Sequence, residues 1–305
     1  MAAGRKIIKP DIKQELFSIF GGGFKEKEMM SKHTTLCLGG PADYFVEVKN
    51  EKELILVIKA AKKDKIPFYV IGGGSNLLFE DKGFNGLIIK LTGEFRKTEV
   101  TDGYVVCGSG ALLSEAVKKS TEYSLSGLEY FIAIPGTVGG AVYGNAGLKE
   151  IWIDSVIDTV ETVNHRGQKQ VFKRDEIHFK YRESGLENCV ITKVRFVLKK
   201  ADKNDILNIV SQEIERRIKS QPAGTKNAGC VFKNPQGDSA GRLIDSLGLK
   251  NYAAGGIKIS DVHANFFINT GSGTANDMKS MIDFVKNKVK EKCNIDLKTE
   301  IKIIK

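Results

Sequence analysis

The chain has 305 residues, of which 41% are hydrophobic and 28% charged, and its formal net charge is +10 at pH 7. This length allows two or three packed units, and the composition is typical of a soluble globular protein, not a disordered or membrane-spanning one. No apolar run approaches the roughly 20 residues that cross a bilayer, and residues 1–10 lack the apolar stretch of a secretory signal.

The net charge favours anionic ligands. The basic residues are spread along the whole chain, however, whereas a nucleic-acid-binding protein gathers them on one surface. Charge alone therefore leaves both small phosphate-rich ligands and nucleic acid open.

Periodicity and composition predict the helices and strands in chain order. Residues 51–65 form an amphipathic helix that Pro67 ends, and the apolar residues 68–71 form a short strand that runs into a glycine-rich turn. The remaining strands are expected at 87–91, 104–107, 156–163, 168–172 (after a turn at 165–167), 190–198 and 297–304. The remaining helices are expected at 112–123, from the charged break at 199–204 to about 220, and at 274–293.

The charged break at 199–204 separates strand-rich from helix-rich sequence, which indicates a domain boundary near residue 203. The fold class is therefore α+β, with a smaller αβ unit in the C-terminal third.

The five cysteines are odd in number and scattered, without a CxxC pair. Disulfides and a metal site are not expected, and a reducing cytoplasm is the expected compartment. The cysteines are Cys37, Cys107, Cys189, Cys230 and Cys293.

Two glycine-rich segments indicate a phosphate-binding site. The sequence Gly-Gly-Gly-Ser-Asn at 72–76 follows a predicted strand, and consecutive backbone N–H groups there can face one anion. The spacing is not that of a dinucleotide-binding GxGxxG motif. A second segment, 134–141, continues to 145–147 and is predicted to be another loop with free N–H groups, now with apolar spacers suited to a flat ring. Each segment alone is also compatible with a plain tight turn.

Three further segments carry side chains suited to acid–base and charge-stabilising chemistry. Cys230 lies in the turn Ala-Gly-Cys-Val-Phe-Lys-Asn-Pro at 228–235, Arg182 follows Tyr181, and Glu300 opens an apolar segment. Arginine offers a planar fork for a carboxylate or a developing enolate. The alternatives are an ordinary turn, a surface arginine and an edge carboxylate.

Read together, these motifs resemble one family, UDP-N-acetylenolpyruvoylglucosamine reductase. The resemblance extends from Thr-Thr-Leu-Cys-Leu-Gly-Gly-Pro-Ala-Asp at 34–43 to Glu300. It includes the glycine-rich segments, Gly-Leu-Glu at 127–129, Tyr-Arg-x-Ser at 181–184, the turn at 228–235 and His-Ala-Asn-Phe at 263–266.

The resemblance implies a two-subdomain FAD-binding fold of the vanillyl-alcohol-oxidase type with a C-terminal substrate domain. The implied units are residues 1–90 (to which 294–305 return), 91–202 and 203–293. The short connection from Tyr181 to Cys230 favours the compact subclass without a large inserted substrate loop.

The resemblance also implies the chemistry, in which NADPH reduces FAD and the flavin N5 passes hydride to C3 of UDP-N-acetylglucosamine enolpyruvate. Arg182 and Glu300 would stabilise the enolic intermediate, and Cys230 would deliver a proton to C2 to give UDP-N-acetylmuramate for peptidoglycan. The residues implied for substrate binding are Tyr181, Arg182, Gly229 and Asn234. Those implied for cofactor binding are Gly72, Gly73, Gly74, Ser75, Asn76, Leu77, Pro135, Gly136, Val138, Gly139, Asn145 and Gly147.

Two departures from the family pattern bear on the site. The usual proton donor is serine, whereas a cysteine at 230 has an ordinary pKa of about 8.5, is mostly protonated at neutral pH and adds a redox liability. Leu-Lys-Glu at 148–150 stands where members commonly have Ala-Tyr-Gly, so a flavin contact there is left open.

Two alternatives stay open from the sequence. One is a flavoprotein of the same fold that acts on another alcohol or hydroxy acid, and the other is a catalytically silent nucleotide- or RNA-binding protein. One bound flavin per chain would exclude the catalytically silent nucleotide- or RNA-binding protein. We expect a monomer without nucleic-acid or membrane partners.

Overall fold

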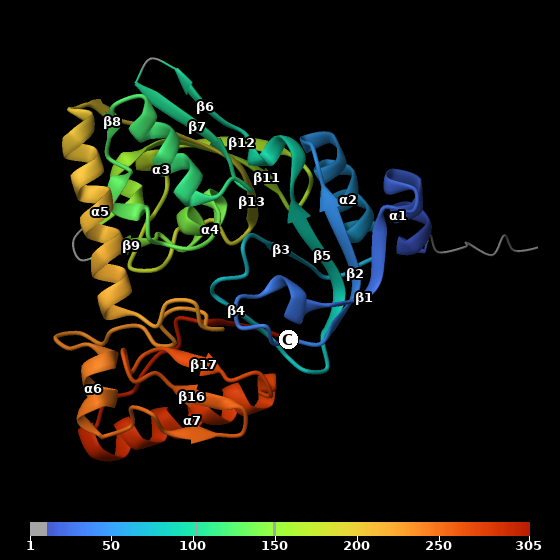
Figure 1. The fold of residues 1–305 in the computed structure, drawn as a ribbon. Helices are drawn as coiled ribbons and strands as arrows, with labels where there is room; N and C mark the ends of the chain where they lie inside the picture. The colour runs from blue at the N-terminus through green and yellow to red at the C-terminus, as the bar shows by residue number, and fades with distance from the viewer. Residues whose placement is uncertain (1–10, 102, 149–150) are drawn as a thin grey trace, which may run out of the picture.

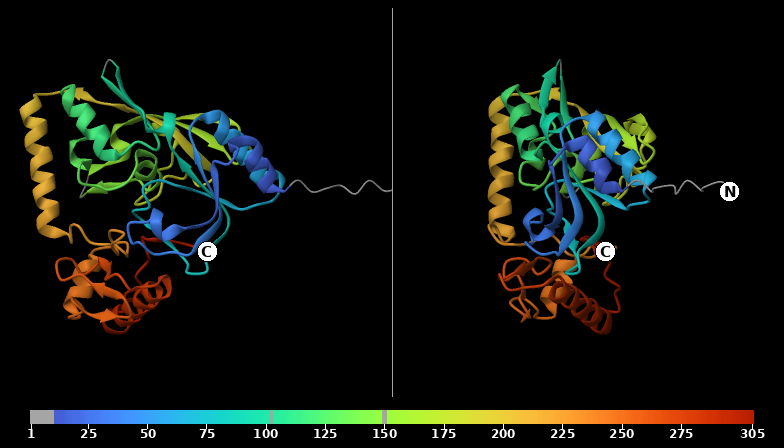
Figure 2. Two further views of the ribbon diagram at one scale, coloured as in Figure 1. Left: turned by 45° about the vertical axis from the view of Figure 1, so that its right-hand side comes forward. Right: turned by 90° about the vertical axis from the view of Figure 1, so that its right-hand side faces the viewer.

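The structure is a computed structural model that describes residues 11–101, 103–148 and 151–305 (Figure 1). The N-terminal segment 1–10 and two residues of the departure at 148–150 lie outside the described residues. The chain packs as three units, and the third lies below the other two, with α5 (Lys203–Ser220) running down one side to it (Figure 2).

The first unit is a four-stranded sheet with two helices. Its strand order is β1 (Phe24–Met29), β2 (Pro41–Val48), β5 (Phe84–Leu91) and β3 (Phe68–Ile71). Only β1 and β2 pair antiparallel; β2, β5 and β3 are parallel. The predicted helix is α2 (Glu51–Lys63), beside α1 (Ile12–Phe20), and it buries Leu54, Val57 and Ile58. The Asn50 side chain caps its N-terminus.

The second unit is an antiparallel five-stranded sheet with helices packed against it. Its strand order is β12 (Lys169–Lys173), β11 (Ile157–Asn164), β13 (Cys189–Val197), β7 (Tyr104–Gly108) and β6 (Thr98–Thr101). Its helices are α3 (Leu113–Glu122) and α4 (Val138–Tyr143), and α5 also packs against α3. The bounds of each strand predicted in this unit agree with the observed bounds within two residues.

The predicted domain boundary at residue 203 stays a prediction. Because α5 packs against α3 of the second unit, the structure favours a boundary nearer residue 221, after α5 ends.

The third unit combines a small sheet with two helices. Its elements are α6 (Ala240–Ser246), β15 (Ala253–Ala254), β16 (Ile257–Ile259), β17 (Phe267–Asn269) and α7 (Ala275–Cys293). The core beneath them holds Phe232, Phe267 and Met278, and it is continuous with Leu36 and Leu78 of the first unit. The units therefore share an apolar interior.

Short strand pairs and 3₁₀ turns connect these units. The pairs are β4 (Leu77–Phe79) with β18 (Lys302–Ile304), β8 (Leu125–Ser126) with β14 (Lys199–Lys200), and β9 (Gly147–Leu148) with β10 (Ile151–Trp152). The 3₁₀ turns are η1 (Met30–His33), η2 (Gly93–Arg96), η3 (Glu129–Phe131), η4 (Ile153–Val156) and η5 (Arg174–Glu176). None of the described helices has the length and apolarity needed to cross a membrane.

Two sequence predictions are wrong in form. The segment 297–304 is not one strand: only β18 pairs with β4, while the N–H groups of Glu300 and Ile301 both bond to the carbonyl of Val231. The chain therefore crosses here from the third unit to the first. The second glycine-rich segment is not an open loop, because the Thr137 side chain accepts from Gly140 N–H and starts α4.

Candidate active site

The two glycine-rich segments, far apart in the chain, touch each other. The Ser75 hydroxyl donates to the carbonyl of Pro135 at 3.2 Å. A Cβ on Gly73 would lie 3.1 Å from the Cα of Gly136, and a Cβ on Gly136, whose φ is +117°, would lie 2.9 Å from the Ser75 hydroxyl. Glycine is required on both sides because the two backbones approach so closely.

This pair of segments presents unsatisfied backbone donors. Within the described part of the chain, the N–H groups of Gly73 to Asn76 and of Gly136 and Thr137 donate to no acceptor. Adjacent N–H groups of this kind form an anion-binding concavity. The prediction of free donors is wrong at Val138 and Gly139, whose N–H groups donate to the carbonyls of Ala111 and Ser109.

The neighbouring predicted glycines are needed for packing. A Cβ on Gly72 would lie 2.4 Å from the Thr137 hydroxyl, and one on Gly74, at φ +66°, would lie 2.0 Å from the His33 carbonyl. A Cβ on Gly139 would lie 2.7 Å from that of Ser109. Leu77 is buried at the start of β4.

Two buried polar atoms beside these segments have no partner among the described residues: Asn145 Oδ1 and the Ser109 hydroxyl. The orientation of the Asn145 amide is fixed because its Nδ2 donates to the Lys180 carbonyl at 3.2 Å. Unsatisfied buried polar atoms are costly, and a bound cofactor can supply the missing partners. The site therefore fits a ligand with phosphates and a polar ring.

Arg182 lies in a strained turn. Lys180 and Glu183 exchange backbone hydrogen bonds at 2.9 and 3.1 Å, and Arg182 between them has φ +62°, a conformation that L-residues rarely adopt. Backbone strain of this kind is retained mainly at functional sites.

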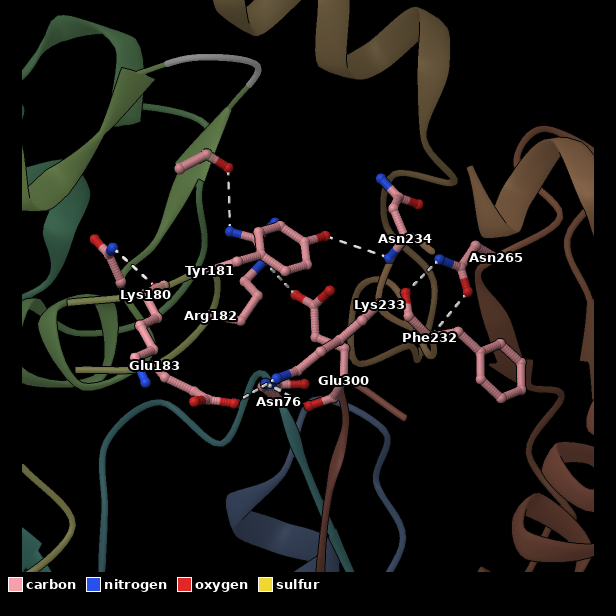
Figure 3. A network of polar contacts seen from close by, with 12 residues as sticks. Asn76, Lys180, Tyr181, Arg182, Glu183, Phe232, Lys233, Asn234, Asn265 and Glu300 are labelled. Carbon is pink, nitrogen blue, oxygen red and sulfur yellow. Dashed lines mark hydrogen bonds and ion pairs between the residues drawn. The ribbon is translucent and has the colours of Figure 1, made fainter. Parts of the chain in front are cut away.

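Glu300 lies against Arg182 in the interior (Figure 3). Glu300 Oε1 is 2.9 Å from Arg182 Nε, but the N–H does not point along that line, so the contact is an ion pair and not an aligned hydrogen bond. Burial raises the pKa of the Glu300 carboxyl above its ordinary value, and the positive charges of Arg182 and Lys233 oppose that rise.

Cys230 is brought beside this pair by the backbone. The Glu300 N–H donates to the carbonyl of Val231 at 2.8 Å, so Glu300 lies next to the residue that follows Cys230. Burial first, and then the Glu300 charge, raises the pKa of the half-buried Cys230 thiol to about 12. The thiol therefore stays protonated at neutral pH. Because the thiolate is the form that oxidises readily, Cys230 is less prone to oxidation than its ordinary pKa suggests.

Two of the predicted substrate residues, Tyr181 of the second unit and Asn234 of the third, touch each other. The Asn234 N–H donates to the Tyr181 hydroxyl at 3.3 Å, and Tyr181 is 40% exposed. The side-chain oxygen of Asn234 accepts from Ala240 N–H, which leaves its amide nitrogen for a ligand. Gly229, at φ +73°, has open space where a Cβ would point.

Three residues at the site were not named as site residues from the sequence. Lys233 forms an ion pair with Glu183 at 2.9 Å, which links the third unit to the second. Asn265 donates to and accepts from the backbone of Phe232 at 2.8 and 2.9 Å, which holds the segment after Cys230. The guanidinium of Arg182 packs on Trp152. Lys233 and Asn265 lie within the quoted motifs, whereas nothing in the sequence links Trp152 to Arg182.

All five cysteines are free, and no group of at least three His, Cys, Asp or Glu side chains that could hold a metal ion occurs among the described residues.

Comparison with known proteins assigns the chain to a family. Residues 42–171 match the family "FAD binding domain", and residues 221–304 match "UDP-N-acetylenolpyruvoylglucosamine reductase, C-terminal domain". With the paired glycine-rich segments, these matches define an FAD-dependent oxidoreductase with the predicted two-subdomain flavin fold.

The chain belongs to the UDP-N-acetylenolpyruvoylglucosamine reductase family. It is 40% identical to the reductase of Carboxydothermus hydrogenoformans over 97% of this chain and 99% of that one. It is 37% identical to reductase 2 of Symbiobacterium thermophilum over 92% of both chains.

Solved structures support the same fold. The crystal structure of UDP-N-acetylenolpyruvylglucosamine reductase from Thermus caldophilus superposes with a TM-score of 0.81 at 36% identity, over 91% of this chain and 98% of that one. Phl p 4.0202, a glucose dehydrogenase, has a TM-score of 0.50 at 13% identity over 64% of this chain and 45% of its own, and shares the fold alone.

Proposed function

We propose that this enzyme uses NADPH and FAD to reduce UDP-N-acetylglucosamine enolpyruvate to UDP-N-acetylmuramate, with Arg182, Glu300 and Cys230 as its catalytic residues. Bound FAD supplies the hydride that it receives from NADPH. The chain's own residues then have three tasks, which are to hold the enolpyruvyl group, to stabilise its developing negative charge and to deliver one proton.

The cofactor site is proposed at the touching glycine-rich segments. The free N–H groups of Gly73 to Asn76 would bind the phosphates, because they are adjacent donors without protein acceptors. Gly136 and Thr137 face them from the other segment, and Asn145 Oδ1 and the Ser109 hydroxyl can satisfy polar ring atoms.

Charge stabilisation is assigned to Arg182 and Glu300. When hydride is added at C3 of the enolpyruvyl ether, electron density moves toward the carboxylate, where the guanidinium of Arg182 can stabilise it. Glu300 holds that guanidinium through the 2.9 Å ion pair in a partly buried setting, where the interaction is less screened than in water.

Proton delivery to C2 is assigned to Cys230. Its thiol remains protonated because burial raises its pKa to about 12, and the nearby positive charges of Arg182 and Arg217 stabilise the thiolate left after transfer. Tyr181, Gly229 and Asn234 would bind the remainder of the substrate where the second and third units meet.

One observation carries this proposal. Arg182, Cys230 and Glu300, which come from three distant parts of the chain, meet in a partly buried cluster next to the paired glycine-rich segments. The Asn76 side chain joins the two sites directly by donating to the Glu300 carbonyl at 3.3 Å.

The test separates the two half-reactions by anaerobic stopped-flow spectroscopy. Arg182→Ala and Glu300→Gln should leave flavin reduction by NADPH nearly unchanged. Reoxidation by the enolpyruvyl sugar should slow by on the order of 10²-fold or more, because a charge-stabilising partner is lost. Equal slowing of both half-reactions would assign these residues a structural role.

NADPH as reductant, the cytoplasm as compartment and the monomeric state stay predictions. Nucleotide sugars and NADPH are made in the cytoplasm, which supports the first two. Comparing flavin reduction by NADPH and NADH at equal concentration tests the first.

A further inference from the structure

Arg182 is supported laterally by two aromatic rings. Its guanidinium carbon lies 5.4 Å from the centre of the Trp152 ring and 5.5 Å from that of Tyr181. The two rings are themselves edge to face, 5.5 Å apart at 85°. A guanidinium at this distance from aromatic rings is attracted by their π-electrons, so both its position and its tilt are restrained.

The Trp152 ring rests on Gly147. The two residues pair across β9 and β10, and a Cβ on Gly147 would lie only 2.4 Å from Cε3 of the indole and 2.7 Å from Cδ2. The carbonyl of the same glycine accepts from Arg182 Nη1 at 3.2 Å. The cofactor role predicted for Gly147 stays a prediction, and the geometry adds contact with the indole and acceptance of a hydrogen bond from Arg182.

These contacts leave a defined part of the guanidinium for a ligand. Nη1 bonds to Gly147, Nε faces Glu300, and Nη2 makes no hydrogen bond within the described residues. Arg182 itself lies at φ +62° in the turn between Lys180 and Glu183. The rings of Trp152 and Tyr181 flank the guanidinium and restrain the direction in which Nη2 points.

We propose that Trp152 is a positioning residue for the substrate half-reaction: seated on Gly147, its indole orients Arg182 so that Nη2 faces the substrate carboxylate. This inference rests on the proposed role of Arg182. Trp152 is the only tryptophan of the chain, so its replacement also removes the protein's indole signal and confirms the variant spectroscopically.

The test compares Trp152→Leu, Trp152→Phe and Gly147→Ala in the FAD-loaded enzyme by anaerobic stopped-flow measurement of both half-reactions. Trp152→Leu should lower the ratio of reoxidation rate to substrate KM by roughly 5- to 30-fold, the range for loss of one cation–π contact. Flavin reduction, flavin content and Tm should stay near wild type. Trp152→Phe keeps a ring and should stay within about threefold.

Gly147→Ala tests the same contact without removing the ring. Its new Cβ would press on the indole and also on the Ile151 carbonyl, at 2.7 Å. The loss should be at least that of Trp152→Leu, and combining both substitutions should add little beyond the loss in Gly147→Ala. The matched control is Tyr104→Leu, because Arg195 packs on Tyr104 at 4.9 Å in the second unit, away from the site. That variant should not affect reoxidation.

Three outcomes overturn the inference. They are normal reoxidation in both Trp152→Leu and Gly147→Ala, equal slowing of both half-reactions, and an additional loss when Trp152→Leu is made in Arg182→Ala. Failure of the proposed function can be told apart from failure of this inference. If Arg182 has no role in the substrate half-reaction, Arg182→Ala by itself leaves reoxidation unchanged.

Discussion

At the scale of single residues, Cys230 shows how tertiary surroundings set chemistry. A thiol with its ordinary pKa of about 8.5 is a fair acid at neutral pH but also a reactive nucleophile. Burial and the Glu300 carboxylate raise the pKa of Cys230 to about 12, which brings the thiol closer to the hydroxyl that the family normally uses.

Replacement of Cys230 tests its role as the acid. Cys230→Ser should keep substantial activity, because a hydroxyl can deliver the same proton. Cys230→Ala should lose on the order of 10²-fold or more in product formation, the range for one positioned acid. Deuterium incorporation at C2 of the product, measured by mass spectrometry in D₂O, follows the step directly. Normal turnover of the Ala variant would remove Cys230 from the mechanism.

The raised pKa of Cys230 also predicts the pH profile. A raised pKa keeps the active, protonated form until the pH nears 12, so at pH 9 only roughly one thiol in a thousand is ionised. Reoxidation should therefore be independent of Cys230 ionisation between pH 6 and about 9, and alkylation of Cys230 should be slower than that of the exposed Cys37. Peptide mapping after iodoacetamide treatment checks the second point, and preferential labelling of Cys230 would refute it.

At the scale of elements, the two glycine-rich segments differ in what their glycines do. The segment at 72–76 is an open turn with free N–H groups, whereas the second segment winds into α4, where Gly139 packs on Ser109. Both read as glycine-rich turns in the sequence. Only the segment at 72–76 has backbone N–H groups without acceptors through most of its length.

Valine substitutions separate these roles. Gly73→Val should abolish FAD binding, because the new side chain stands among the free N–H groups of the turn, and should lower Tm only slightly, because its Cβ lies 3.1 Å from the Cα of Gly136. Gly139→Val should lower the free energy of unfolding by about 1–3 kcal/mol, because its Cβ overlaps Ser109. Gly140→Ala is the control, with its nearest neighbour at an ordinary 3.5 Å. Flavin absorbance per chain and thermal unfolding give both readouts. Stoichiometric flavin in Gly73→Val would show that its segment is only a turn.

At the scale of the whole molecule, the third unit is held to the first by polar contacts as well as by the shared core. Asp81 of the first unit accepts from the N–H groups of Ala275 and Asn276, both at 2.8 Å, at the start of α7. The Asn269 side chain donates to the Leu36 carbonyl at 2.9 Å. Thr274 is the N-cap residue of α7, and Asp81 acts as an additional cap from the first unit on the same helix end.

Removal of this cap should destabilise the molecule without altering the site. Asp81→Ala should lower the free energy of unfolding by about 0.5–2 kcal/mol, the range for a lost N-cap. Asp296→Ala, which removes an exposed ion pair with Lys290, should change it by less than about 1 kcal/mol. Chemical denaturation measures both, and equal effects would show that Asp81 does not act as a cap.

The sequence by itself determined the elements with strong local signals, the family, and the side chains that we propose as catalytic. The 3.6-residue periodicity of α2 and the β-branched runs of β11 and β13 appear in the local order of residues, so their bounds were predicted within two residues. Motif order was enough to identify the family and to select Arg182, Cys230 and Glu300.

Only the tertiary structure decided how these residues act. The pKa of Cys230 depends on burial and on a carboxylate seventy positions away, the free N–H groups depend on which carbonyls lie nearby, and Trp152 meets Arg182 through a strand pair. The crossing at Glu300 appeared as an ordinary strand in the sequence, because alternation does not reveal which partner a backbone finds. Long-range contacts carry no local periodicity, so they are decided only when the chain folds.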